Sequence, residues 1–296
     1  MKNEFSAGSK ALKGHMMALF TASVWGVTFI SSKVLLRTFS PVEVLFVRFL
    51  IGFLVLMIIC PRRMPFQGWR GELPFFLCGL SGITCYYFLE NMALTYAQAS
   101  TVSLIICTAP FFTALLAHFF LKEKALTLKF FAGFVLSMIG IVMITLSDGS
   151  TLEFGFLGSI LAVLAAFTWG IYSICTRRAE SFGYNTLQMT QRFFFYGVLC
   201  MIPGLPVMSF HPELAELVQP VNLLNFLFLG IVACAGCFVT WNYALKTLGT
   251  VKTTMYVYLS PVITVLASIP ILGEKLTVLS IAGIILTMAG VILSER

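Results

Sequence analysis

Charged residues are scarce in this chain. Of its 296 residues, 19 are Lys or Arg and 12 are Asp or Glu, 10% of the sequence, while 59% of the residues are hydrophobic. A soluble protein carries about 25% charged residues, and a single core cannot hide so much apolar surface. The shortage of charge therefore excludes a soluble globular protein and predicts an all-α polytopic membrane protein.

Several catalytic motifs are also missing. No G-x-x-x-x-G-K-[ST] phosphate loop occurs, which excludes ATP hydrolysis by this chain as an energy source. No H-E-x-x-H or other metal cluster occurs, and we expect neither a metal nor a cofactor. The eight cysteines fall within apolar runs or at their ends, so we expect small buried residues rather than disulfides. The basic residues sit in short loops, so the net charge of +7 does not indicate nucleic acid.

Apolar runs near 20 residues, separated by short connections, predict ten membrane-spanning helices. Residues 1–13 are then a cytoplasmic tail, because the first run is too long for a cleavable signal, and residues 148–154 are an extracytoplasmic linker. The predicted spans are residues 14–36, 41–60, 73–96, 99–121, 126–146, 155–176, 185–208, 221–245, 250–272 and 276–294.

The basic residues predict the orientation. Fourteen lie on the N-terminal side of the predicted spans: Lys2, Lys10, Lys13, Arg62, Arg63, Arg70, Lys122, Lys124, Lys129, Arg177, Arg178, Lys246, Lys252 and Arg296. The opposite side has three, Lys33, Arg37 and Lys275. Because cytoplasmic loops carry the excess of Lys and Arg, both termini are predicted in the cytoplasm, with the chain in the cytoplasmic (inner) membrane.

The sequence repeats itself. "VWGVTF" at 24–29 matches "TWGIYS" at 168–173, and "FVRF" at 46–49 matches "TQRF" at 190–193. "ENMAL" at 90–94 matches "WNYAL" at 241–245, and "AGFVLSMIG" at 132–140 matches "AGIILTMAG" at 282–290. Residues 14–147 and 155–294 thus form two five-helix repeats. Because five is odd, the second repeat starts from the opposite face, and the repeats are inverted, as in secondary transporters.

These motifs together resemble a known family. A Trp-Gly in the first helix, Arg-Phe in the second, Asn-x-Ala-Leu ending the third, a proline within the fourth and Glu-Lys opening the fifth all occur twice. In this order they resemble the drug/metabolite transporter superfamily, EamA branch, over about residues 14 to 294. The resemblance implies ten helices around a central cavity and export of amino acids or similar small metabolites.

Pro110 and Pro261 occupy matching places, roughly 15 Å into the fourth and ninth predicted helices at 1.5 Å per residue. Each proline frees the carbonyl four residues earlier, at Ile106 and Val257. A freed carbonyl in lipid must face protein or a water-filled cavity. We therefore expect cavity-lining kinks or hinges; the alternative is a static kink satisfied by a neighbouring Ser or Thr.

The segments after these prolines predict turns and then tight packing. Glu123 and Glu274 are interpreted as turn and helix-start residues at opposite membrane faces. The helices that follow each carry small residues on one face, which favours close contact in lipid, and we expect these two helices to pack against each other. The small residues are Gly133, Ser137, Gly140, Gly283, Thr287 and Gly290.

Three charged residues lie inside predicted spans, and such charges are functional candidates whose partners must be found. Arg48 and Glu90 are predicted at similar depths and are candidate partners; alternatively, Arg48 caps backbone carbonyls and Glu90 faces water. Arg192 is the repeat-mate of Arg48, and this symmetry predicts a structural role for both. Glu90 has Trp241 as its mate, so the unmatched acid is the stronger candidate for contact with substrate or a coupling proton.

Aromatic residues with a few polar neighbours are predicted around the middle of the membrane. Such a surface suits an amphipathic ligand, and an ammonium group can lie on an aromatic face. For any single ring, contact with lipid or packing against other helices is the alternative to substrate binding. Together with Glu90, the predicted substrate-binding residues are Trp25, Tyr86, Asn91, Trp169, Tyr172, Trp241, Asn242 and Tyr256.

The sequence therefore favours a secondary transporter or exchanger that exports a small, amino-acid-like metabolite by alternating access. Its expected partners are that substrate and the lipid bilayer, and its expected state is a monomer or weak homodimer. A facilitator, which moves its substrate without coupling to an energy source, is an alternative. A membrane-embedded enzyme would need convergent catalytic groups, and a channel would need a ring of like charges or a backbone filter; neither pattern is found. The first predicted helix holds no acid, which disfavours proton coupling as in the related small multidrug resistance proteins.

Overall fold

The computed structural model describes residues 2–121, 127–147, 152–208, 210–248, 253 and 255–294. Within these ranges the regular elements are all helical, in agreement with the all-α prediction. The elements are α1 Lys2–Leu35, α2 Pro41–Ile59, α3 Gly68–Cys78, η1 Gly79–Cys85, α4 Tyr86–Tyr96, α5 Ala99–Ile106, α6 Ala109–Leu121, α7 Leu128–Ser147, α8 Leu152–Glu180, α9 Thr186–Met201, η2 Ile202–Gly204, α10 Leu214–Leu217, α11 Pro220–Leu227, η3 Phe228–Gly236, α12 Cys237–Leu248, η4 Met255–Tyr258, α14 Leu259–Leu272 and α15 Val278–Ser294.

Several of these helices are long and apolar enough to cross a membrane. Six qualify within the described ranges: Lys10–Leu35, Pro41–Ile59, Gly68–Tyr96, Ala99–Phe120, Gly155–Glu180 and Pro220–Leu248. Three shorter apolar helices are Leu128–Ile144, Tyr256–Leu272 and Val278–Gly290. The protein is thus a multi-pass membrane protein, while the count of ten crossings stays a prediction.

Some predicted boundaries differ from the structure. Helix α1 already begins at Lys2, within the segment predicted as a tail. The seventh predicted span, 185–208, is α-helical only to Met201, and a 3₁₀ turn that contains Pro203 follows. This boundary has a physical reason, since proline lacks the N–H that continues a helix. The predicted turn at Glu123 and residues 148–151 of the predicted linker lie outside the described residues.

Helix α2 begins with a capping box. Ser40 Oγ accepts a hydrogen bond from the Glu43 backbone N–H, and Glu43 Oε2 accepts one from the Ser40 N–H (2.8 Å). Pro41 follows Ser40 at the first helical position, where its fixed φ suits a helix start. The other carboxylate oxygen of Glu43 accepts the backbone N–H of His211 at 3.0 Å. The start of α2 is thereby tied to the segment between α9 and α10.

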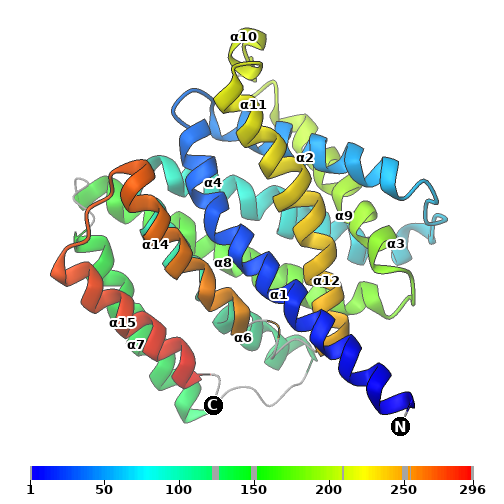
Figure 1. Ribbon diagram of the computed structural model, residues 1–296, viewed down its shortest axis with the longest axis horizontal. Helices are drawn as coiled ribbons and strands as arrows, with labels where there is room; N and C mark the ends of the chain where they lie inside the picture. The colour runs from blue at the N-terminus through cyan, green and yellow to red at the C-terminus, as the bar shows by residue number, and fades with distance from the viewer. Residues whose placement is uncertain are drawn as a thin grey trace.

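Helices α7 and α15 lie side by side at one edge of the molecule (Figure 1). Gly140 faces the backbone of Gly283, and Gly290 faces that of Gly133, so the two helices run antiparallel. Ser137 Oγ donates to the carbonyl of Thr287 at 3.0 Å. The predicted packing of these two helices through small residues is confirmed, and the antiparallel direction is the one that inverted repeats require.

Matching helices of the two halves make matching contacts. Helix α1 packs against α12 and α14, and its counterpart α8 packs against α4 and α6. In Figure 1, α1 runs between α12 and α14. Thr21 of α1 bonds Thr240 of α12 at 2.7 Å, and Cys78 of α3 bonds Thr176 of α8 at 3.6 Å. Helices α1 and α8, together with their neighbours α4, α6, α12 and α14, form the middle of the protein, where both halves meet.

The fourth and ninth spans are both interrupted near their prolines. Helix α5 ends at Ile106, and α6 restarts at Ala109 with Pro110 as its second residue. The 3₁₀ segment η4 precedes α14, whose third residue is Pro261. Each proline therefore stands in the first turn of a helix, where its fixed φ is compatible with helical geometry.

A feature that the sequence did not reveal is a π-helical segment in the third and eighth spans. Segment η1, Gly79–Cys85, leads into α4, and segment η3, Phe228–Gly236, leads into α12. They occupy equivalent places in the two repeats. A π-helix inserts extra residues per turn and is often found at functional sites. Here it sets the rotation of the helices that carry Glu90 and Trp241.

Candidate functional site

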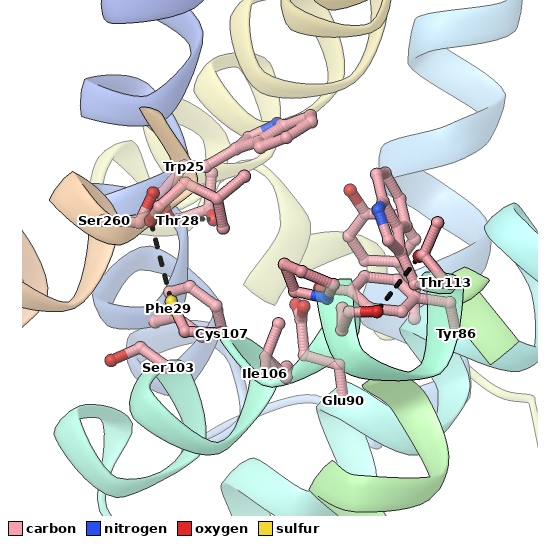
Figure 2. Close-up of a pocket in the computed structure, with 15 residues that line it drawn as sticks. Trp25, Thr28, Phe29, Tyr86, Glu90, Ser103, Ile106, Cys107, Thr113 and Ser260 are labelled. Atoms are coloured by element: carbon pink, nitrogen blue, oxygen red, sulfur yellow. Dashed lines mark hydrogen bonds between the residues drawn. The ribbon is translucent and has the colours of Figure 1, made fainter. Parts of the chain in front are cut away.

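A cavity lies between the two halves, lined by α1, α4, α5, α6, α8, η4 and α14. Its free space is about 50 Å³. Figure 2 shows Glu90 pointing from its helix toward the middle of the lining side chains. The lining residues are Trp25, Thr28, Phe29, Tyr86, Tyr87, Glu90, Ser103, Ile106, Cys107, Ala109, Pro110, Thr113, Trp169, Val257 and Ser260.

The repeated Trp-Gly motif places one tryptophan of each half at this cavity. A Cβ added to Gly26 would lie 2.8 Å from the carbonyl oxygen of Ser260, and one added to Gly170 would lie 3.1 Å from the backbone of α6. Only glycine permits so close a crossing of two helices. The crossings hold Trp25 and Trp169, the preceding residues, against the cavity.

The predicted aromatic residues form one connected cluster. The rings of Trp25 and Trp169 meet edge to face, with centroids 5.7 Å apart at 88°. Tyr86 and Tyr172 each lie 4.9 Å from Trp169, and Trp241 lies 5.0 Å from Trp25. Edge-to-face and tilted pairs at such distances are favourable aromatic contacts. The structure thus brings together five aromatic residues singled out in the sequence.

A second, smaller cavity has a free space of about 40 Å³. Trp169 lines both cavities. Tyr172 and Trp241 face this second cavity rather than the first. Its lining residues are Trp169, Tyr172, Ser173, Thr176, Arg177, Glu180, Trp241 and Leu245. Arg177 places it toward the face predicted to be cytoplasmic.

Glu90 is the one carboxylate among the residues that line the central cavity. Its side chain is only 2% exposed, and Oε1 has no hydrogen-bond partner among the described residues. A buried carboxylate oxygen without a partner is costly. Burial combined with an unmet acceptor makes Glu90 the strongest single candidate for ligand contact.

Arg48 makes its contacts elsewhere. It is fully buried, its Nη1 donates to Ser32 Oγ at 3.3 Å and its Nε to Cys234 Sγ at 3.4 Å. The guanidinium carbon also lies 4.5 Å from the ring centre of Tyr87, a cation–π contact. In the described part of the chain no ion pair joins Arg48 to Glu90. The two predicted partners therefore form no ion pair, and their charges interact only through space.

Arg192 has a partner that the sequence interpretation missed. Its Nη2 pairs with Glu72 Oε1 at 3.3 Å and donates to the carbonyl of Met64 at 2.8 Å. Tyr196 donates its hydroxyl to Glu72 Oε2 at 2.9 Å. Glu72 is only 2% exposed although the sequence placed it just outside the third span. Arg192 thus holds the connection before α3 against α9, a structural arrangement.

Three predicted substrate-binding residues line neither of the two cavities. Asn91 Nδ2 donates to the carbonyl at the start of α2 (3.1 Å), and Asn242 Nδ2 donates to Thr190 Oγ1 (3.0 Å). Each asparagine is buried between helices, where its amide joins two of them. The Tyr256 hydroxyl hydrogen-bonds with His15 Nδ1 at 2.8 Å.

The carbonyl that Pro261 leaves without an N–H partner is satisfied from the other half. Cys107 Sγ donates to the carbonyl oxygen of Val257 at 3.6 Å. Cys107 stands in the break between α5 and α6, and both residues line the central cavity. The interruptions of the fourth and ninth spans therefore meet each other at the cavity, with Pro110 on its wall.

Glu274 caps a helix, but one in the opposite half. Its Oε1 accepts the Ala99 N–H at 2.7 Å, and its Oε2 accepts the Ser100 hydroxyl at 2.6 Å. The carboxylate thus sits at the N-terminus of α5, where the helix dipole favours negative charge. The sequence predicted a role at the start of the helix that follows Glu274, but the structure places its carboxylate at the start of α5 in the other half. This contact joins the two halves on the side predicted to be extracytoplasmic.

Several lining residues were missed by the sequence interpretation: Thr28, Phe29, Tyr87, Ser103, Thr113 and Ser260. Four of them carried a usable signal. Thr28 and Phe29 follow Trp25 by three and four positions, Tyr87 precedes Glu90 by three and Thr113 follows Pro110 by three, so each shares a helix face with a residue that the sequence singled out. Ser103 and Ser260 give no such signal.

Comparison with known proteins defines the class. The EamA-like transporter family matches residues 12–146 and again residues 156–296, once in each half. The molecule is thus a membrane transporter with a duplicated helical unit around a central cavity. This chain belongs to the EamA-like transporter family.

Individual relatives support this family assignment. An uncharacterized transporter of Archaeoglobus fulgidus is 30% identical over 289 residues, which cover 95% of this chain and 97% of that protein. A probable terminal-alkyne amino-acid exporter of Streptantibioticus cattleyicolor is 30% identical over 220 residues, covering 74% and 72%. A solved crystal structure, 20% identical, superposes with a TM-score of 0.63 over 97% of this chain and 96% of the other, which shows the same fold.

Proposed function

We propose that this protein is a secondary active transporter or exchanger that exports a small amphipathic, amino-acid-like metabolite across the cytoplasmic membrane. The observation that carries the proposal is a cavity lined by both halves, with aromatic faces and one unpartnered carboxylate oxygen. Sites between inverted repeats are typical of secondary transporters. The name of the Streptantibioticus relative, a probable amino-acid exporter, supports the substrate class and the direction.

Transport proceeds by alternating access in this proposal. The cavity offers a free space of about 50 Å³ in this arrangement, and in this proposal the halves move to admit a substrate. The hydrogen bonds of Glu274 to Ala99 and Ser100 join the halves on the predicted outer side. They must break when the cavity opens there. The contact between the rings of Trp25 and Trp169 must break when the cavity opens on the other side.

The proposed topology has ten crossings with both termini in the cytoplasm. Reporter fusions at Lys124 and at Arg296 should therefore both show cytoplasmic activity, because fourteen of the loop basic residues lie on that side against three. A fusion at Lys275 is the matched control, and it should report the opposite side. An extracytoplasmic signal at either of the first two positions would contradict the ten-crossing arrangement.

Pro110 and Pro261 are hinges in this proposal, at the two span interruptions that meet at the cavity. Replacing either with Ala should slow transport several-fold while changing substrate affinity little, because alanine restores a backbone donor and stiffens the interruption. Pro270→Ala is the control, since Pro270 is an exposed proline of the same helix α14. Initial transport rates and binding constants would be measured on all three variants. Equal loss of rate and affinity, or loss of neither, would argue against hinges.

Uptake and release by proteoliposomes test the transport proposal itself. Purified protein would be reconstituted and challenged with a panel of radiolabelled amino acids and their amine derivatives, with and without a pH gradient. Saturable movement of at least one compound is the expected result. Chemical conversion of a compound, without its movement, would favour an enzyme instead.

A further inference from the structure

The serine and threonine hydroxyl groups of the central cavity can act only as hydrogen-bond acceptors toward a ligand. Each of these four has already given its single proton to a backbone carbonyl. Thr28 donates to Trp25 (2.7 Å), Ser103 to Ser100 (2.9 Å), Thr113 to Ala109 (3.0 Å) and Ser260 to Ala22 (2.8 Å). A hydroxyl has one donor and two acceptor lone pairs. What remains for a ligand in the cavity is therefore oxygen lone pairs.

Other potential donors of the lining are occupied as well. The indole N–H of Trp25 donates to the carbonyl of Ala233 at 3.4 Å, and the Cys107 thiol donates to Val257. The Tyr86 phenol is engaged with Glu90, so the neutral donors that remain on the lining are the phenol of Tyr87 and the indole of Trp169. The cavity is thus rich in acceptors and poor in donors.

The charge in the cavity has one sign. Glu90 lines it with an unpartnered oxygen, and no Lys, Arg or His is among the fifteen lining residues, all of which the structure describes. Arg48 is close by in the fold, but its nitrogens donate to Ser32 and Cys234, and its guanidinium lies over the ring of Tyr87. A ligand in the cavity therefore meets a carboxylate and no cation.

We propose that the central cavity binds primary-amine cations that carry no free carboxylate: monoamines, amino alcohols and amino-acid amides. The ammonium group donates three hydrogen bonds, to Glu90 Oε1 and to hydroxyl lone pairs, while the rings of Trp25, Trp169 and Tyr86 accept the apolar body and face the charge. The inference rests on the proposed function and narrows its amino-acid-like substrate.

A free amino acid suits this cavity less well. Its carboxylate would lie in a low-dielectric space beside the like-charged Glu90, where repulsion is strong. It would also lose its hydration with few donors to replace the water. An amide, an alcohol or a plain hydrogen in place of the carboxylate removes both costs while keeping the ammonium group and the side chain.

A matched ligand series tests the inference. Phenethylamine, phenylalaninamide, phenylalanine and 3-phenylpropionate share one apolar body and differ in charge. Their binding to the purified wild-type protein in detergent would be measured by isothermal titration calorimetry, and isopentylamine, leucinamide and leucine would repeat the test with an aliphatic body. We expect the amine and the amide to bind at least about tenfold more tightly than the amino acid, as a charge-assisted contact allows, and the carboxylate alone not to bind.

Several results would overturn the inference. They are phenylalanine binding as tightly as phenethylamine, any binding of 3-phenylpropionate at matching concentration, or no binding of any amine in either series. The test needs no variant, so it does not depend on the folding of one. Saturable transport of free amino acids in the proteoliposome panel, with no binding of amines, would sink this inference and leave the proposed function standing. No transport of any compound would remove the proposed function.

Discussion

Transport by the Glu90→Gln variant is expected to fall by about tenfold to a hundredfold, with folding unchanged. A hydrogen bond to a charged group contributes about 1.5–3 kcal/mol, and Glu90 holds the only carboxylate on the cavity lining, with Oε1 unpartnered. Gln keeps the size of the side chain but removes the charge. No ion pair within the described residues is lost with it, so the melting temperature should stay close to that of the wild type. Both quantities are measurable on one preparation.

Glu213→Gln is the matched control for this change. Glu213 is an exposed acid next to the short helix α10, so the same loss of charge there should leave transport unaltered. If Glu90 exchanges a coupling proton rather than binding the ammonium group, Glu90→Gln should instead flatten the dependence of transport on pH. Wild-type transport by Glu90→Gln at every pH would remove Glu90 from the site.

Gly140→Ala is expected to lower the stability of the protein strongly. Its Cβ would lie 2.3 Å from Thr287 Oγ1 and 2.6 Å from the carbonyl oxygen of Gly283. The second atom belongs to the backbone of α15 and cannot move without shifting that helix. Overpacking of this kind costs about 1–3 kcal/mol. The measurement is thermal unfolding in detergent, and Gly290→Ala should behave alike, because its Cβ would lie 2.5 Å from the carbonyl oxygen of Gly133.

Gly204→Ala serves as the control for these glycine variants. The nearest neighbour of an added Cβ there is Met208 Sδ at 4.0 Å, so the melting temperature should hardly change. A Gly140→Ala protein as stable as the wild type would show that α7 and α15 are not packed this closely in the membrane. Interactions other than close packing through small residues would then hold the two repeats together at α7 and α15.

Features that depend on local pattern were predictable from the sequence. The small residues of α7 and α15 recur at helical spacing, and they meet as expected, Gly140 against Gly283. Trp25, Tyr86, Glu90 and Trp169 combine a polar or aromatic character with a place inside apolar runs, and they line one cavity. A repeated motif read twice carries more information than either copy, which is why the architecture could be inferred without any structure.

Features that depend on contacts between distant segments were not predictable. Nothing in the sequence near Glu72 indicates that it reaches Arg192, 120 positions later. Asn91 and Asn242 are polar residues within apolar runs, a pattern shared by ligand-binding side chains and by those that join helices. Their amides hydrogen-bond other helices, and only the packing around them decides between the two roles. The cap from Glu274 to α5 likewise crosses from one half to the other.

The π-helical segments were not predictable for a different reason. A regular α-helix has 3.6 residues per turn, whereas η1 and η3 in the third and eighth spans have more residues per turn. Each insertion rotates the rest of its helix relative to the part before it. The sequence therefore could not establish how the parts that carry Glu90 and Trp241 are rotated relative to the parts of the same spans before η1 and η3.

Counterflow in proteoliposomes tests the central claim, transport by alternating access through the shared cavity, most directly. Vesicles would be loaded with an unlabelled excess of the compound from the panel that moves fastest, then diluted into a trace of the labelled form. A carrier that exchanges internal for external substrate should accumulate the labelled compound inside the vesicles to a transient concentration above that outside. The rate of this uptake should saturate as the concentration of the compound rises. Label that only equilibrates, at a rate rising linearly with concentration, would contradict alternating access and indicate a channel.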